Sequence, residues 1–178
     1  MRLQNTELQN TIDDLCKSRK QFADIINSLP DAALVINNDG QVIVWNRTME
    51  KMTGIQAEEM LGKNDYEYAI PFYGKKRPLL IDLVLRNDQS RLEDMSHHYT
   101  NINKEGDILS GEAYTPALEK GKSAHLYATA SLLRNSGGEV IGAIECFRDN
   151  TGRKELEEKL IHSERQYRNL VDNSPVGV

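Results

Sequence analysis

The side chains that most often perform chemistry in proteins are few in this sequence and widely spaced. The 178 residues include two cysteines and four histidines. Cys16 and Cys146 lie far apart without a CxxC pair, so neither a zinc site nor a disulfide framework is predicted. A reduced, cytoplasmic setting is the simpler explanation of these thiols, and Cys146 is expected to be a small core residue.

Catalytic motifs are also missing from the sequence. The patterns GxxxxGKS/T, GxSxG and HExxH do not occur. Carboxylate pairs such as Glu58-Glu59 fall on polar helix faces, where solvation is expected. His162 lacks the Thr-Pro that follows in a kinase phosphoacceptor box, and no segment is suited to ATP. We therefore predict that this chain is not itself an enzyme and holds no metal site.

Composition and charge limit the partners that the chain can have. The net charge of −5 is spread along the sequence without a basic patch rich in aromatic residues, so nucleic acid is not an expected partner. The mean hydropathy is −0.58. No apolar run approaches the roughly 18 residues of a membrane span, and residues 1–20 are too polar for a signal peptide. We expect this segment to be soluble and to make no membrane contact.

The end of the sequence repeats a segment near its beginning. Residues 163–167 (SERQY) correspond to residues 18–22 (SRKQF), an offset of 145 residues (163 − 18), and Pro175 then falls on Pro30. One unit with its connector would therefore take about 145 residues. We interpret the chain as a piece of a longer tandem array, in which a second unit has just begun.

Two helical segments with an apolar seam flank the unit. In residues 1–29, apolar residues recur every seven positions, with two more between them, as in a parallel coiled coil. A second seam runs through residues 155–170. The residues predicted to form a dimer interface are Leu8, Ile12, Leu15, Phe22, Leu156 and Leu160. Alternatively, Phe22, Ile25, Ile26 and Leu29 pack on their own domain.

The segment between the helices predicts an α+β domain with a five-stranded antiparallel sheet covered on one face by short helices. Turn residues such as Asn38-Asp39-Gly40 separate the apolar runs. The predicted strands are 32–37, 41–45, 108–118, 124–134 and 140–148. The predicted helices are 1–29, 46–52, 56–61, 79–86 and 155–170, with 64–78 irregular and 88–98 either a loop or a frayed helix.

A sheet covered in this way can enclose a small pocket between its inner face and the helices. Most of the apolar candidates for its lining are core positions in any version of the fold. Trp45, Tyr68 and Tyr127 add polar atoms that can orient a ligand. The candidate pocket residues are Leu34, Ile36, Ile43, Trp45, Met49, Tyr68, Leu83, Tyr127 and Ile144.

The order of several short motifs resembles a PAS domain. Leu29-Pro30-Asp31-Ala32 leads into the first strand, Asp39-Gly40 forms the first turn, and Trp45-Asn46 ends the second strand. At the other end, Asp149-Asn150-Thr151-Gly152-Arg153-Lys154 is similar to the Asp-x-Thr-x-Arg-Lys exit of PAS domains, where Ile more often stands in the middle. The segment 66–78 departs from a minimal PAS domain.

This resemblance implies a division of the chain and a role for each part. Residues 1–21 are expected to be an N-terminal signalling helix, 22–154 the PAS domain, 155–166 a linker helix, and 167–178 the start of a second PAS-like repeat. PAS domains are typically sensory modules of histidine kinases, cyclases and other transducers, and they commonly dimerise through flanking helices. Thr151 is expected to cap the last helix and Asp149 to hold the junction, which would couple the sheet to the helix. The alternative is a plain helix cap without a switching role.

The resemblance also bears on cofactors. Some PAS domains bind haem through a histidine on the covering helix, but residues 79–86 contain none, so haem is not expected. Flavin photosensors of this superfamily use a cysteine in an Asn-Cys-Arg-like helix. No cysteine falls between residues 17 and 145, which excludes that photochemistry. The ligand therefore stays unidentified at this point.

Taken together, these features predict a cytoplasmic PAS sensory module of a multi-PAS transducer such as a histidine kinase. A small ligand or partner would alter its core, and the flanking helices of a homodimer would relay the change to neighbouring PAS or kinase domains of the same chain. The alternative is a ligand-free dimerisation or spacer module.

Overall fold

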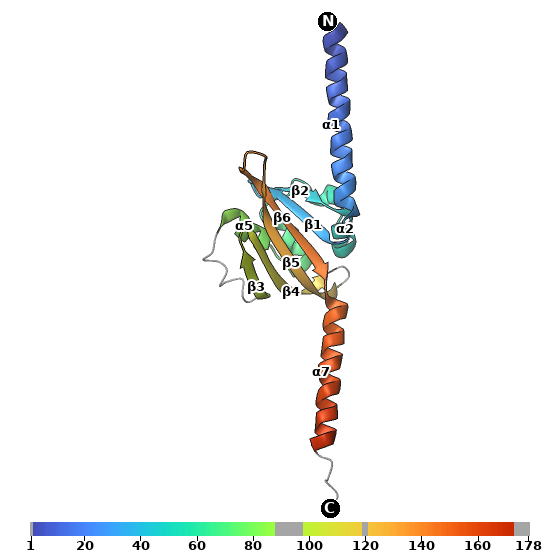
Figure 1. Cartoon of the computed structure of the whole chain (residues 1–178), viewed down its shortest axis with the longest axis vertical. Coiled ribbons are helices and arrows are strands. Elements are labelled where there is room, and N and C mark those ends of the chain that lie inside the picture. Colours follow the sequence, from blue (N-terminus) through green and yellow to red (C-terminus); the bar gives the residue numbers. More distant parts are fainter. Residues whose placement is uncertain (1, 88–97, 119–120, 173–178) are drawn as a thin grey trace, which may run out of the picture.

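The computed structural model describes residues 2–87, 98–118 and 121–172 of the chain (Figure 1). A six-stranded antiparallel sheet forms its centre, with strand order β2-β1-β6-β5-β4-β3. Short helices pack on one face of this sheet, and two long helices, α1 and α7, leave the domain in opposite directions (Figure 1). The class is the predicted α+β fold.

The strands follow the predicted order with one addition. Residues 64–78, which were predicted to be irregular, contain two short helices, so that prediction was wrong. Residues 88–97 of the predicted loop lie outside the described part of the chain. The helices are α1 (Arg2–Ser28), α2 (Arg47–Thr53), α3 (Ala57–Met60), the 3-10 helix η1 (Glu67–Ala69), α4 (Ile70–Tyr73), α5 (Leu80–Arg86) and α7 (Thr151–Asp172). The strands are β1 (Ala32–Asn37), β2 (Val42–Trp45), β3 (Tyr99–Glu105), β4 (Ile108–Leu118), β5 (Lys122–Arg134) and β6 (Val140–Asp149).

The added element is β3, which makes the prediction of five strands wrong. This strand lies at the edge of the sheet and pairs with β4 through an irregular register between Thr100 and Asn103. Tyr99 is its one buried residue, and most of the others are exposed. An edge strand of this kind has no apolar alternation, so its sequence, YTNINKE, does not differ from that of a polar loop.

The first hairpin forms where turn chemistry predicts it. The Asn37 side chain accepts hydrogen bonds from the backbone N–H groups of Asp39 and Gln41. Gly40 then takes a left-handed conformation, with φ of 77°, which closes the turn. This hairpin sets β1 beside β2, and β1 pairs with β6 on its other edge.

The core lies between the sheet and the short helices. Inner-face residues of the central strands alternate with residues on the opposite face, as the period of a strand requires. Helix α5 contacts β5 and β6, while α4 covers β4. Large enclosed side chains of this core include Leu34, Ile36, Met49, Phe72, Leu80, Ile81, Leu126 and Phe147.

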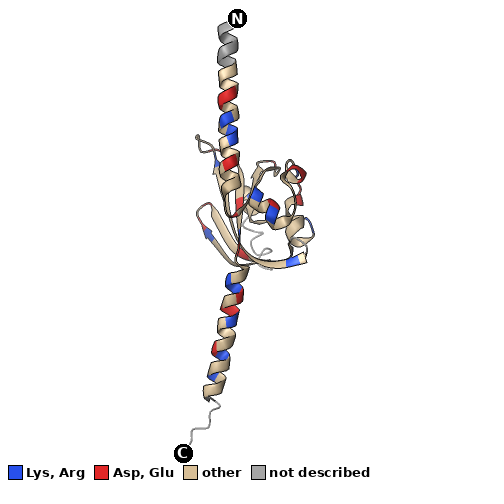
Figure 2. Cartoon of the chain, turned by 90° about the vertical axis from the view of Figure 1, so that its right-hand side faces the viewer, with Lys and Arg blue, Asp and Glu red and all other residues tan. Residues whose placement is uncertain are grey.

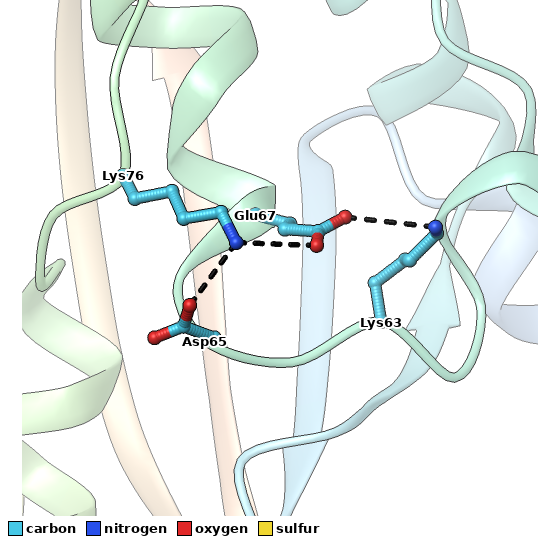
Figure 3. Close-up of polar contacts among 4 residues, drawn as sticks. All are labelled: Lys63, Asp65, Glu67 and Lys76. Carbon is cyan, nitrogen blue, oxygen red and sulfur yellow. Dashed lines mark hydrogen bonds and ion pairs between the residues drawn. The ribbon is translucent and has the colours of Figure 1, made fainter.

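Ion pairs on the surface connect residues on either side of the short helices η1 and α4 (Figure 3). Lys76 Nζ lies 3.0 Å from Asp65 Oδ2 and 3.3 Å from Glu67 Oε1, and Lys63 Nζ lies 3.6 Å from Glu67 Oε2. Asp65 and Tyr66 both have positive φ, of 50° and 60°. A positive φ is unfavourable for residues other than glycine. The ion pairs therefore lie at a turn that the sequence of this segment disfavours, and they add a small stabilisation to it.

Among the described residues, none of the helices is both long enough and apolar enough to cross a bilayer.

Candidate functional site

The N-terminal joint is built around Asn46, whose side chain is 1% exposed. Its Oδ1 accepts hydrogen bonds from the backbone N–H of Ala33 and of Met49, each at 2.9 Å. Its Nδ2 donates to the carbonyl oxygens of Ile26 at 3.2 Å and Asp31 at 3.1 Å. One side chain therefore links the end of α1, the start of β1 and the start of α2.

The C-terminal joint connects β6 to α7 through β5. The Thr151 hydroxyl accepts a hydrogen bond from the backbone N–H of His125 at 3.0 Å. The backbone N–H of Asn150 donates to the carbonyl of the same His125 at 2.8 Å, and Asp149 Oδ1 accepts from the N–H of Thr151 at 2.8 Å. The first turn of α7 is thus bonded directly to the neighbouring strand of the sheet.

Of the two roles expected at the exit, that of Asp149 is found and that of Thr151 is not. The Asp149 carboxylate holds the junction of β6 and α7 by a hydrogen bond, because it accepts from the backbone N–H of Thr151. The expectation that Thr151 caps the helix was wrong, because its hydroxyl accepts from the backbone N–H of His125 on β5 and so fixes the start of α7 to the sheet. An adjacent ion pair, Lys154 Nζ to Glu112 Oε2 at 2.9 Å, ties α7 to β4 and raises the pKa of the lysine.

The two joints are connected to each other by a bidentate ion pair. Arg148, near the end of β6, donates from Nη2 to Asp31 Oδ2 at 2.7 Å and from Nε to Asp31 Oδ1 at 3.1 Å. Asp31 lies between α1 and β1, and its carbonyl is one of the acceptors of Asn46. The pair therefore joins the strand that precedes α7 to the segment that follows α1. We call it the Asp31–Arg148 clasp.

The predicted seams of α1 and α7 are uncovered in the single chain. Ile12, Leu15, Phe22, Leu156 and Leu160 are between 43% and 67% exposed, and Leu8 lies outside the residues whose side chains are described. Charged residues of both signs lie along both helices beside them (Figure 2). The alternative of packing on the same domain fails for Phe22 and Ile25, which are 57% and 61% exposed.

Polar side chains occupy the core under α5. The Tyr68 hydroxyl donates to Asp82 Oδ1 at 2.5 Å, and the Asp82 carboxylate also accepts from the backbone N–H of Leu79 at 2.8 Å. Both side chains are buried. Burial raises the pKa of Asp82, although its two hydrogen bonds act in the opposite direction. Burial and the neighbouring carboxylate also raise the pKa of Tyr68.

Glu145 is the most unusual residue of this core. It projects from the inner face of β6 and is 0% exposed. Its Oε2 accepts from the backbone N–H of Ile81 at 3.1 Å, and its Oε1 has no hydrogen-bond partner within the described part of the chain. Burial, and next to it the charge of Asp82, raise the pKa of Glu145 to about 8, against the backbone N–H groups that lower it. A carboxyl group in this position therefore keeps its proton to a higher pH than an exposed glutamate does.

A cavity of about 260 Å³ lies beside the end of α5. Leu83, Leu109 and Leu132 form part of its apolar lining. The charged side chains of the lining are Lys104, Asp107 and Arg134, and the last two form an ion pair at 2.9 Å. This volume is close to the lower limit for small-molecule sites. Within residues 2–87, 98–118 and 121–172, no group of three or more His, Cys, Asp or Glu side chains is arranged to hold a metal ion.

Three of the nine predicted pocket residues do not face the core. Ile43 is 50% exposed because a bulge interrupts the β1–β2 register beside it, so that Val42 and Trp45 are the buried residues of that strand. Tyr127 and Ile144 lie on the opposite face of the sheet, since their neighbours in the strands are the buried ones. Placing these three residues at the pocket was wrong.

The other six predicted pocket residues are buried in the core, and Leu83 also lines the cavity described above. Their contact with a ligand stays a prediction. Sequence reasoning missed Glu145, because an inward Ile144 was more plausible than an inward carboxylate. The buried apolar residues Ala143 and Phe147, which share the parity of Glu145, were the available signal.

Comparison with known proteins supports the fold described above. Residues 20–149 match the family model described as the PAS fold. The chain is 27% identical over 146 residues to the signal transduction histidine-protein kinase AtoS of Escherichia coli (strain K12), covering 79% of this chain and 20% of AtoS. It is 20% identical over 173 residues to phytochrome B-2 of Glycine max, covering 97% of this chain and 14% of the phytochrome.

Two solved structures share the architecture. An RNA-binding Light-Oxygen-Voltage receptor superposes with a TM-score of 0.55 at 19% identity, covering 83% of this chain and 37% of the receptor. The PAS domain of Bordetella pertussis BvgS superposes with a TM-score of 0.50 at 19% identity, covering 84% of this chain and 98% of that domain. At these identities the likeness concerns the fold alone. The chain spans a fifth or less of the length of the two curated relatives.

Proposed function

The chain belongs to the PAS fold family, and from this premise we propose that it is a sensory module that relays changes in its core to the helix that follows. Its relative AtoS is a signal transduction histidine-protein kinase. In the proposed relay, a small ligand or partner alters the packing of the short helices on the sheet. The last strand then moves against the C-terminal joint, and α7 changes its rotation or register.

The single observation that carries this proposal is the hydrogen bonding of the C-terminal joint. Inner-face residues of β6 contact the core, and Asp149 of the same strand bonds the first residue of α7. Thr151 and Asn150 then fix that turn to His125 of β5. A displacement of β6 against β5 must therefore strain or break the bonds that orient α7.

We propose further that the module works as a homodimer. Helices α1 and α7 extend along roughly one line on either side of the domain (Figures 1 and 2). A second, parallel copy could then cover the exposed apolar residues of both helices at once. In a longer protein, neighbouring PAS or kinase domains of the same chain would receive the signal through these helices.

The relay can be tested by measuring the separation of the two α7 helices in the dimer. A spin label at Arg165→Cys, with both native cysteines replaced, reports this separation by pulsed electron paramagnetic resonance. Tyr68→Phe serves as the stimulus, because it removes the hydroxyl bonded to Asp82 in the core. We expect it to change the distance distribution. Thr151→Val removes the hydrogen bond to His125. We therefore expect the double variant Tyr68→Phe/Thr151→Val to give the same distance distribution as Thr151→Val alone.

Two results would count against the proposal. A distance distribution that is identical with and without Tyr68→Phe favours the passive spacer, which only dimerises. Single subunits in light scattering at high concentration would remove the dimer. Native mass spectrometry with an absorbance scan of the purified chain adds a direct test for a bound small molecule.

A further inference from the structure

Glu145 is a fully buried acid whose hydrogen bonding is incomplete. One carboxyl oxygen accepts the backbone N–H of Ile81, in the first turn of α5, and within the described residues the other has no partner. An ionised carboxylate with a free oxygen in an apolar core is strongly unfavourable, whereas the neutral acid is tolerated. The packing of the core around Glu145 should therefore differ between its protonated and its ionised form.

The titratable and charged groups around Glu145 come from every element packed on it. Its cross-strand neighbours, Leu34 of β1 and Ala130 of β5, are apolar. The charged form of Glu145 raises the pKa of three tyrosines, and the nearby arginines act on Tyr73, Tyr99 and Asp82. The groups concerned are Tyr68 of η1, Tyr73 of α4, Arg77 of the following loop, Asp82 and Arg86 of α5, and Tyr99 of β3.

Asp82 makes the cluster responsive to charge. It is carried by α5, is itself buried, and is the carboxylate whose charge raises the pKa of Glu145. Ionisation of both groups would thus place two negative charges at the buried contact between α5 and β6. Release of the proton of Glu145 to solvent creates this repulsion, and its return removes it.

We propose that Glu145 is a proton-binding site that controls how α5 packs on the sheet, so that the proton is a ligand of this domain. With the proton bound, α5 lies on β6 as described. On release of the proton, α5 loosens and water reaches the carboxylate. Coupling of this step to α7 rests on the proposed function, but proton binding at Glu145 does not.

The proton site is tested by titrating the full chain with 13C-labelled glutamate side chains and following the carboxyl carbons by NMR. The Glu145 signal is assigned by its loss in Glu145→Gln. We expect its titration midpoint to lie well above the ordinary value for glutamate. A midpoint of Glu145 in the ordinary range of glutamate would overturn the proposal. Should Glu145→Gln fail to fold, a single resonance of the wild-type chain that titrates apart from all others carries the same information.

Hydrogen exchange tests the response of α5. After correction for the intrinsic rates, the protection of the α5 amides should fall at least tenfold between pH 6 and pH 9 in the wild-type chain. In Glu145→Gln it should stay constant. Constant protection in the wild type, or a co-purified small molecule that donates to the free oxygen, would overturn the proton switch. If Glu145 titrates at the expected raised midpoint but the α7 distances do not change with pH, only the relay is refuted.

Discussion

Replacement of Asn46 by alanine is the most direct test of the N-terminal joint. The side chain makes four hydrogen bonds to backbone groups of α1, β1, α2 and the segment between them. Alanine removes all four without adding bulk. It leaves the N–H groups of Ala33 and Met49 without their acceptor in a site that is closed to water.

The expected loss can be worked out from these groups. A buried N–H that loses its partner costs about 1–3 kcal/mol, and loss of an Asn helix cap typically costs about 1 kcal/mol. The Met49 N–H is the capped group, so the two estimates overlap there. We therefore expect Asn46→Ala to lower the free energy of unfolding by about 2–4 kcal/mol, measured by urea unfolding. Domains of this size are stable by about 5–15 kcal/mol, so the variant should still fold.

Asn46→Asp separates the two halves of this effect. Aspartate keeps the acceptor for Ala33 and Met49, but it replaces the donor by an oxygen that faces the carbonyls of Ile26 and Asp31. We expect the helix cap to survive and the end of α1 to lose its attachment, seen as faster hydrogen exchange in the last turn of α1. A loss below about 1 kcal/mol for Asn46→Ala would refute this account of the joint.

Three further predictions concern the sheet, the core and the dimer. Gly142→Ala should lower stability by several kcal/mol in urea unfolding, because its Cβ would clash with the backbone carbonyl oxygen of Ile36 in β1, whereas at Gly152 a Cβ would point into open space and Gly152→Ala should not. Glu145 has a pKa of about 8 in the folded chain and 4.5 as its ordinary value, so the folded state binds the proton more tightly. Wild-type stability should therefore fall between pH 5 and pH 8, by at most about 4 kcal/mol, and Glu145→Gln should flatten this slope. Leu160→Glu should abolish dimers in light scattering while leaving the unfolding midpoint of the monomer unchanged, since this side chain is 61% exposed.

Turn and cap residues account for the parts of the fold that the sequence predicts well. Asn38-Asp39-Gly40 marks the first hairpin, and Asn46 and Gly54 bound α2 as expected of a cap and a left-handed stop. These signals are local, because a side chain bonds its own neighbouring backbone. Both exit residues were likewise recognised, but the hydrogen-bond partner of Thr151, His125, lies 26 residues away, so the expected role of Thr151 as a helix cap was wrong.

The wrong predictions of pocket residues concern which side chains of a strand point towards the core. The bulge at Ile43 depends on pairing with β1 and leaves no local trace in an apolar strand. In β6 both faces carry apolar residues, so parity alone does not choose between Ile144 and Glu145. The general preference for burying apolar side chains favours Ile144 over Glu145. It fails here because the Glu145 carboxyl group accepts a hydrogen bond from a backbone N–H of α5 and, with its raised pKa, can be buried in the neutral form.

The core and the two joints of this domain are held by different kinds of contact. The apolar core is continuous and fully enclosed, whereas both joints consist of hydrogen bonds between side chains and backbone at the ends of β1 and β6. Such bonds have strict geometry and modest net energy, so a small displacement of a strand can exchange them without unfolding the core. The Asp31–Arg148 clasp connects the two joints, and its arginine is 65% exposed. Its contribution to stability is therefore small. Its consequence is geometric, because a movement of β6 that reorients α7 must also displace the segment that follows α1.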